Sequence, residues 1–441
     1  MIIKPLMILL GVHQLPNRAQ GLVQKFVVVL IFADFLFYLS STFYVLFVID
    51  SVGFAQLGLL LAVRFLLQAL LDYPSGALGD WIGQKWVLFI AYLAYALAYA
   101  LLIWADSFSA LLVVYLLYGF AASQQSGAWD AWFDNNYRVA AQEPDPQRET
   151  YKLFFGRRRM VMNFIGAVAF IVGGIAATIH FRESIFAIQA IGMFVVAIVI
   201  LFVIKDFAEV ERPKKTLQEY FKLLGEGFYL VVSNRALLFL MIGICCYGVV
   251  WAVWGEMILF PLYFGYTGTD AGASILRFII WIITIPIVFF AAKLAAQLGI
   301  KWYPRINLIF SILFFGSIML LTAWIPPEDT FEPIGFILTA IFIGSIMLFF
   351  YITELLDRRI FLDLIPDRNR SSVYSLRPTL VLLARVPGVI IGGLFLTDLG
   401  LPITIGILGT LGIIATIFFY IAIRFLPNDI LEHPNSFVEE K

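Results

Sequence analysis

Apolar runs, each long enough to cross a lipid bilayer, recur along almost the whole chain and limit its fold more than any other feature. A transmembrane helix needs about 20 mostly apolar residues. Six such runs occupy residues 26–49, 54–73, 86–104, 108–127, 160–179 and 184–204. After a polar stretch, six more occupy residues 237–260, 271–293, 306–324, 334–351, 373–396 and 401–423. The pattern predicts an all-α polytopic membrane protein with 12 transmembrane helices in two six-helix bundles.

The composition supports a membrane protein and argues against several other classes. Of the 441 residues, 61% are hydrophobic and 14% are charged, whereas ordinary soluble domains have about 45–50% and about 25%. The formal net charge is zero, so we expect no nucleic acid partner. The two cysteines are adjacent inside an apolar run, and the three histidines lie outside the runs. We therefore expect no metal, no cofactor and no disulfide framework.

The two sets of runs divide the chain into five segments. We expect a cytoplasmic or interfacial N-terminal segment at 1–25, a bundle at 26–204, a cytoplasmic linker at 205–236, a second bundle at 237–424 and a cytoplasmic tail at 425–441. Within the linker, Thr216-Leu217-Gln218-Glu219 fits a capping box and starts an amphipathic pattern. The predicted helix lies along the membrane face or packs as a connector under the bundles.

The basic residues predict the orientation of the chain. If both termini share one side, nearly all lysines and arginines of the loops fall on that side, and the opposite loops hold one basic residue, Arg182. Cytoplasmic loops are enriched in Lys and Arg. We therefore expect both termini in the cytoplasm, a location in the plasma membrane, and a monomer.

The segment between the second and third runs reads Pro74-Ser75-Gly76-Ala77-Leu78-Gly79-Asp80-Trp81-Ile82-Gly83-Gln84-Lys85. Glycines let backbones approach closely, and an Asp and a Lys can pair near helix ends. We predict a tight, charged turn. The segment resembles the loop between helices 2 and 3 of the major facilitator superfamily of transporters, whose pattern is G-x-L-a-D-r-x-G-r-K. The matching residues are Gly76, Leu78, Asp80, Gly83 and Lys85, whereas Trp81 and Gln84 stand at two basic positions.

Two other stretches are similar to the same family. Residues 126–134, S-G-A-W-D-A-W-F-D, look like a segment of its efflux-type members and place Asp130 and Asp134 at the cytoplasmic end of helix 4. Residues 365–376 are similar to the stretch that leads into helix 11. The resemblance implies two related halves that alternate in access, and an inner latch in which Asp80 bridges to Arg377. Alternatively, Asp80 only caps a helix.

Several ionisable residues interrupt the apolar runs. A charge at mid-bilayer costs at least about 2.5–3.5 kcal/mol, so each must face protein or water. Counted by the helical rise, Asp34 lies about 12 Å and Arg64 about 15 Å from the cytoplasmic face. Arg64, Gln68 and Asp72 share one helix face. Either Asp34 changes protonation or contacts substrate while Arg64 sets its pKa, or the two form a permanent ion pair that orients their helices.

The second half contains two similar features. Glu256 and Arg277, near the outer ends of helices 7 and 8, are predicted to form an outer-side pair that acts as a gate or an anchor. Arg385 lies about 18 Å into helix 11, with no acid at matching depth in its own half. In the resembled family helices 2 and 11 face each other, so Arg385 is expected to share Asp34 with Arg64. The remaining positive charge favours an anionic or electronegative substrate.

Aromatic residues fall on helices that line the cavity in the resembled family, among them Tyr115, Trp251 and Tyr351. They suit flat or amphiphilic organic substrates. The sequence shows no nucleophile–base set and no phosphate-binding loop, so we expect no enzyme. The expected partners are the lipid bilayer, a small-molecule substrate and a proton.

Three functions remain open from the sequence. The first is proton-coupled efflux of hydrophobic or amphiphilic organic compounds, with Asp34 as the proton carrier. The alternative is a proton-coupled symporter that takes up an organic anion, with Arg64 and Arg385 as its ligands. The third is a membrane sensor that transports nothing.

Overall fold

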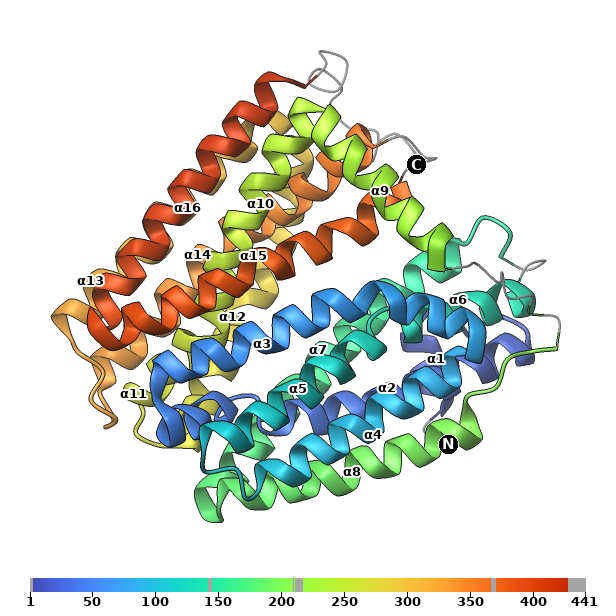
Figure 1. Cartoon of the computed structure of the whole chain (residues 1–441), viewed down its shortest axis with the longest axis horizontal. Coiled ribbons are helices and arrows are strands. Elements are labelled where there is room, and N and C mark those ends of the chain that lie inside the picture. Colours follow the sequence, from blue (N-terminus) through green and yellow to red (C-terminus); the bar gives the residue numbers. More distant parts are fainter. Residues whose placement is uncertain (1–2, 142–144, 209, 211–216, 366–369, 427–441) are drawn as a thin grey trace. The chain divides into compact units, whose positions relative to one another are not determined.

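The computed structural model describes residues 3–141, 145–208, 210, 217–365 and 370–426, and these residues form helices joined by short turns (Figure 1). Within this part of the chain, 12 helical segments are long and apolar enough to cross a membrane. The predicted all-α fold with 12 spans is therefore confirmed.

The chain forms two compact units. The first comprises Met1–Tyr44 and Leu70–Tyr220, and the second comprises Val45–Ala69 and Phe221–Lys441. The sequence placed the segment Val45–Ala69 in the first bundle, whereas in the structure it groups with the C-terminal helices. This grouping puts Arg64 and Arg385 in one unit and Asp34 in the other.

The first unit is built around α2 and α4. The α2 helix packs against α7 and α8, while α4 packs against α5 and α8. Its helices are α1 (Ile3–Leu9), α2 (Asn17–Leu39), α4 (Gln84–Leu102), α5 (Phe108–Gln125), α6 (Ala128–Ala141), α7 (Glu149–Ile179) and α8 (Arg182–Val203). The predicted fourth run, residues 108–127, forms α5, and Gly127, which has a positive φ of 71°, separates α5 from α6.

The second unit is built around α10 and α16. The α16 helix packs against α10 and α13, α10 also packs against α15, and α12 packs against α14. Its helices are α10 (Arg235–Val253), the π-helix η1 (Trp254–Ile258), α11 (Leu259–Gly265), α12 (Asp270–Gln297), the 3-10 helix η2 (Ile300–Trp302), α13 (Tyr303–Trp324), α14 (Pro333–Leu364), α15 (Arg370–Asp398) and α16 (Leu401–Arg424). Both α7 and α14 extend well beyond the apolar runs that predicted them.

The predicted turn over residues 74–85 is wrong in its extent. The α3 helix (Tyr44–Ile82), interrupted at Gly53, continues through most of this segment. It ends only at Gly83, whose φ of 92° favours glycine and whose N–H donates to the Gly79 carbonyl oxygen. The turn is thus a single residue, since α4 begins at Gln84.

The predicted linker helix is present as α9 (Leu217–Ser233). Thr216 and the side chains of Leu217, Tyr220, Phe221 and Leu224, on which the capping box and the amphipathic face rest, lie outside the described residues. Asn234 accepts a hydrogen bond from the Leu237 N–H and so caps the start of α10.

One close contact in each unit depends on glycine. In the first unit, a Cβ atom on Gly173 of α7 would lie 1.8 Å from the Leu39 carbonyl oxygen. In the second unit, a Cβ atom on Gly58 of α3 would lie 2.5 Å from the Val389 carbonyl oxygen of α15. Backbone oxygens cannot move aside as flexible side chains do, so these positions hold the helices at short distances.

We predict that Gly173→Ala lowers the free energy of unfolding by about 1–3 kcal/mol, because α7 must move away from α2 to admit the methyl group. Gly156→Ala is the control, since it lies on the same helix and its Cβ would meet nothing within 4 Å. Thermal unfolding of both variants in detergent measures the difference. Equal midpoints for the two variants would show that the close approach is not limiting.

Candidate functional site

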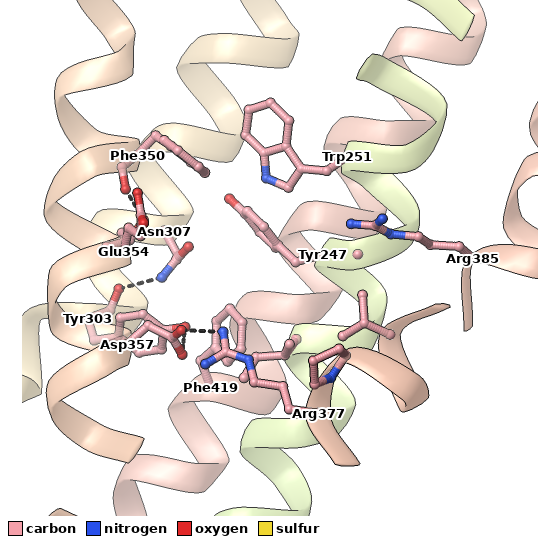
Figure 2. Close-up of a pocket in the computed structure, with 15 residues that line it drawn as sticks. Tyr247, Trp251, Tyr303, Asn307, Phe350, Glu354, Asp357, Arg377, Arg385 and Phe419 are labelled. Carbon is pink, nitrogen blue, oxygen red and sulfur yellow. Dashed lines mark hydrogen bonds and ion pairs between the residues drawn. The ribbon is translucent and has the colours of Figure 1, made fainter. Parts of the chain in front are cut away.

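A cavity of about 510 Å³ lies among α10, α13, α14, α15 and α16 of the second unit (Figure 2). Pockets of about 300–1,000 Å³ hold small organic ligands. Most of its wall is apolar. Its acidic and basic lining residues are Glu354, Asp357, Arg377 and Arg385. The cavity therefore combines an apolar body with a few charged contacts, as ligand sites do.

Aromatic rings form much of the wall. The Trp251 ring meets Phe350 edge to face at a centroid distance of 4.8 Å, and Tyr303 packs against Phe419 at 4.8 Å. The Tyr247 hydroxyl lies 3.2 Å from the Ser311 hydroxyl of α13. These contacts fix the orientation of the rings and leave their remaining faces toward the cavity.

A buried ion pair lies at one end of the cavity. Arg377 of α15 donates to the Oδ2 atom of Asp357 of α14, and the Tyr303 hydroxyl donates to Oδ1 of the same carboxylate at 3.5 Å (Figure 2). Asp357 is only 8% exposed. The Arg377 guanidinium also lies over the Phe361 ring, at 4.4 Å from its centroid. Because the pair is enclosed and links α14 to α15, removal of either partner would leave a buried charge unbalanced.

Two hydrogen-bond donors on the cavity wall have no acceptor within the described part of the chain. They are Nε of Arg385 and Nε1 of Trp251, and both atoms are buried. The Arg385 guanidinium contacts the Phe65 ring, with its carbon 5.6 Å from the ring centroid. Buried donors without acceptors are unfavourable, so a ligand that supplies acceptors would be stabilised here.

A second ion pair joins α3 to the π-helix η1. Nη1 of Arg64 lies 3.3 Å from Oε2 of Glu256, which is placed by the π-helix η1. Arg64 also contacts Phe65, the same ring that Arg385 contacts, at 5.6 Å. Arg385 is near enough to experience the charges of Glu256 and Arg64. The three groups together carry one net positive charge.

The sequence did not foresee the Arg64–Glu256 pair. It expected Glu256 to pair with Arg277, whose guanidinium lies over the Phe260 ring at 4.9 Å. It expected Arg64 to meet Asp34, which lies in the other unit. Both predicted pairings stay predictions.

The surroundings of Asp34 form a polar cluster inside the first unit. Asp34 interacts electrostatically with Arg158 and with Tyr92. The Tyr92 hydroxyl accepts hydrogen bonds from Gln125 and Trp129, each at 3.1 Å. Asp34 is thus an acid within a membrane span that interacts with polar residues of α4 and α7.

Two of the residues predicted at the cytoplasmic side, Asp130 and Asp134, form ion pairs with nearby arginines. Asp130 bonds to Arg158 at 2.8 Å, and Asp134 bonds to Arg138 and Arg148. The others lie along α3 and at its end: Gln68, Asp72, Gly76, Asp80, Gly83 and Lys85. The Lys85 ammonium lies 5.5 Å from the Trp86 ring centroid. Since Asp80 and Arg377 belong to different units, their latch stays a prediction.

Of the aromatic residues predicted to line a cavity, Trp251 does so here. Tyr351 follows Phe350, and Phe350 forms the wall. Tyr115 is buried in the first unit, with its ring 6.1 Å from that of Tyr44. A role for Tyr115 and Tyr351 in a central cavity stays a prediction.

The sequence analysis missed Asp357, Glu354, Tyr303 and Asn307 as site residues. Glu354 and Asp357 lie beyond residue 351, where the tenth apolar run ends, and were therefore assigned to the cytoplasmic loop. The signal that could have found them is the spacing of Glu354, Asp357 and Arg358, which continues a helical period past the run.

Comparisons with known proteins agree on one fold. The sequence profile of the Major Facilitator Superfamily matches residues 26–359. No curated protein matches the chain.

Three similar solved structures span nearly the whole chain. A mutant of the nucleoside transporter NupG is 16% identical, with a TM-score of 0.70, and the match covers 92% of this chain and 100% of that chain. The POT family transporter PepTSo is 10% identical, with a TM-score of 0.71 and coverage of 93% and 98%. A bacterial homolog of the human lysosomal transporter Spinster, in an inward-facing and unoccupied conformation, is 14% identical, with a TM-score of 0.66 and coverage of 95% and 100%. At these identities the likeness shows the fold.

We predict that Asp357→Asn and Arg377→Gln each lower the free energy of unfolding by about 3 kcal/mol, because each leaves an enclosed charge without its partner. The double variant should lose less than the sum, with a coupling of about 1–3 kcal/mol. The unfolding midpoints of the unchanged protein, the two single variants and the double variant measure this coupling. The control cycle is Glu354→Gln with Arg358→Gln, an i,i+4 pair in which the Arg358 side chain is 57% exposed. A coupling for Asp357 and Arg377 no larger than in the control would contradict the prediction.

Proposed function

The chain belongs to the Major Facilitator Superfamily of secondary transporters, and we propose that it carries a small organic solute with an anionic group by alternating access. Membership makes it a multi-pass membrane transporter and not an enzyme.

One observation supports an anionic solute most directly. In the cavity of the second unit, Arg385 presents a charged donor with no acceptor among the described residues, and Trp251 presents a second such donor. Hydrogen bonds between charged groups contribute about 1.5–3 kcal/mol each. A carboxylate or phosphate oxygen supplies the missing acceptor and also balances the net positive charge of Arg64, Glu256 and Arg385.

The aromatic wall supports an organic body on the solute. Rings such as Trp251 and Phe350 bind flat or apolar groups, whereas they offer little to a small inorganic anion. The similar solved structures are named for nucleoside and peptide transport, and these solutes likewise combine apolar with polar groups.

We propose that a proton gradient drives transport, with Asp34 as the proton carrier. Ionisable residues inside membrane spans are rare and commonly mark ion pathways. Asp34 interacts with Tyr92, whose hydroxyl can exchange hydrogen bonds with either state of a carboxyl and itself accepts from Gln125. We further propose that both termini are cytoplasmic and that the protein acts as a monomer in the plasma membrane.

Proton-coupled efflux of amphiphilic compounds is the second candidate. Two features favour it: most of the cavity wall is apolar, and residues 126–134 resemble a segment of efflux-type members of the superfamily. It does not explain the buried Nε donor of Arg385, because a neutral apolar group would leave that donor without an acceptor.

We predict that Arg385→Gln weakens binding of organic anions about tenfold or more, since one charged hydrogen bond is lost. Calorimetry of the purified protein with a panel of aromatic and aliphatic carboxylates and phosphates measures it. Arg424→Gln is the control, because Arg424 is exposed at the end of α16 and outside the cavity. Unchanged anion affinity in Arg385→Gln would refute the proposal, and preferential binding of neutral amphiphiles would favour efflux.

We predict that Asp34→Asn abolishes uptake driven by a proton gradient in proteoliposomes while solute exchange at equal concentrations on both sides continues. Exchange needs only the solute-bound transitions, whereas net transport needs the empty carrier to return with the correct protonation. Asp106→Asn, in an exposed loop, is the control. Full gradient-driven uptake by Asp34→Asn would remove Asp34 as the carrier.

A further inference from the structure

The four charged side chains on the cavity wall are not equally available to a solute. Asp357 and Arg377 neutralise each other, and the Tyr303 hydroxyl adds a further donor to Asp357. Because this pair is enclosed, a solute that separated it would leave one charge unbalanced. The other two charged side chains on the cavity wall are Arg385 and Glu354.

Glu354 has a partner that is easily exchanged. Its Oε1 atom accepts from Nη2 of Arg358 at 2.9 Å, one helical turn further along α14. The Arg358 side chain is 57% exposed. Exposed pairs at this spacing contribute little to stability, so an ammonium group in the cavity can replace Arg358 at small cost.

Asn307 adds an acceptor beside Glu354. Its Nδ2 atom donates to the Tyr303 carbonyl oxygen at 3.0 Å, which fixes the amide and leaves its oxygen to accept. Figure 2 shows Asn307 and Glu354 on the same side of the cavity. An ammonium group carries three donors and no acceptor, so two neighbouring acceptors of this kind suit it.

The opposite side of the cavity carries the donors. Figure 2 shows Arg385 across the cavity from Glu354, with Tyr247 between them and with Phe350 and Trp251 above. Nε of Arg385 and Nε1 of Trp251 lack acceptors within the described residues. The cavity is therefore polarised, with donors on α10 and α15 and acceptors on α13 and α14.

We propose that this cavity selects zwitterionic solutes of the amino acid or short peptide type, with the carboxylate at Arg385 and the ammonium group at Glu354. The inference rests on the transport function proposed above and narrows its solute class. A cavity of about 510 Å³ accommodates such a solute, and its side chain or ring packs against Trp251 and Phe350. Zwitterions with an apolar body therefore bind more tightly than anions or cations with the same body.

The test compares matched probes in two series, built on L-phenylalanine and on L-phenylalanyl-L-alanine. Each series contains the zwitterion, its N-acetyl derivative as the anion and its carboxamide as the cation. Calorimetry with the purified full chain gives the affinities. At least one zwitterion binds about tenfold or more tightly than both of its derivatives, because each charged end adds hydrogen bonds.

Variants of Glu354 and Arg358 test whether Glu354 binds the ammonium group of the zwitterion. Glu354→Gln lowers the affinity of the zwitterion to that of the N-acetyl derivative and leaves the N-acetyl derivative unaffected, which also shows that the protein is folded. Arg358→Gln does not weaken binding of the zwitterion, because it removes a group that competes with the ammonium for Glu354. Glu328→Gln, in an exposed loop outside the cavity, changes neither probe.

The outcomes separate this inference from the proposed function. If the N-acetyl anion binds as tightly as the zwitterion, or Glu354→Gln weakens both equally, selection of zwitterions is refuted while transport of an organic anion stands. If no probe of either series binds, the inference fails, and the carboxylate and phosphate panel used with Arg385→Gln decides the function separately.

Discussion

The cost of an unbalanced charge inside the bilayer determines how the polar residues of this protein are arranged. Within the membrane spans, Arg64 is bonded to Glu256, Arg377 to Asp357 and Asp130 to Arg158. Each pair joins two different helices, so the charges stabilise the packing only while both partners are present. Arg385 departs from this pattern, because it lines the cavity and its buried Nε donor has no acceptor in the described structure. A solute that brings an acceptor to Arg385 would therefore remove this unfavourable state.

Much of the fold follows from hydrophobic length alone. In lipid, the backbone N–H and C=O groups of each segment must form hydrogen bonds within that segment. A run of about 20 apolar residues therefore forms a transmembrane helix. Arg385 was identified on similar grounds, since a charge within such a run needs protein or water around it. Trp251 was identified instead by the resemblance, because its helix lines the cavity in that family. The helix ends were not predictable in this way. The α7 and α14 helices continue past the apolar runs, because helical hydrogen bonding does not stop at the membrane surface, and Glu354 and Asp357 were missed for that reason.

The ion pairs were harder to predict than the charged residues themselves. Counting along a helix gives the depth of a residue but not the direction in which it points across the bundle. Arg64 and Asp34 have similar depths, yet Arg64 is bonded to Glu256, 192 residues further along the chain. The π-helix at Trp254–Ile258 adds a residue to one turn and so changes the direction of Glu256 relative to a regular helix. No periodicity in the sequence marks that turn.

The chemistry of arginine explains how Arg385 can be held in place and still remain available. Its guanidinium contacts the Phe65 ring, and such a contact uses the attraction between the cation and the ring without occupying an N–H group. The five N–H donors of a guanidinium lie in its plane, a geometry that can meet a planar carboxylate in a two-pronged arrangement. A lysine at this position would carry the same charge but present a single point of contact on a flexible chain. The ring therefore positions the charge, and the edge of the guanidinium recognises the solute.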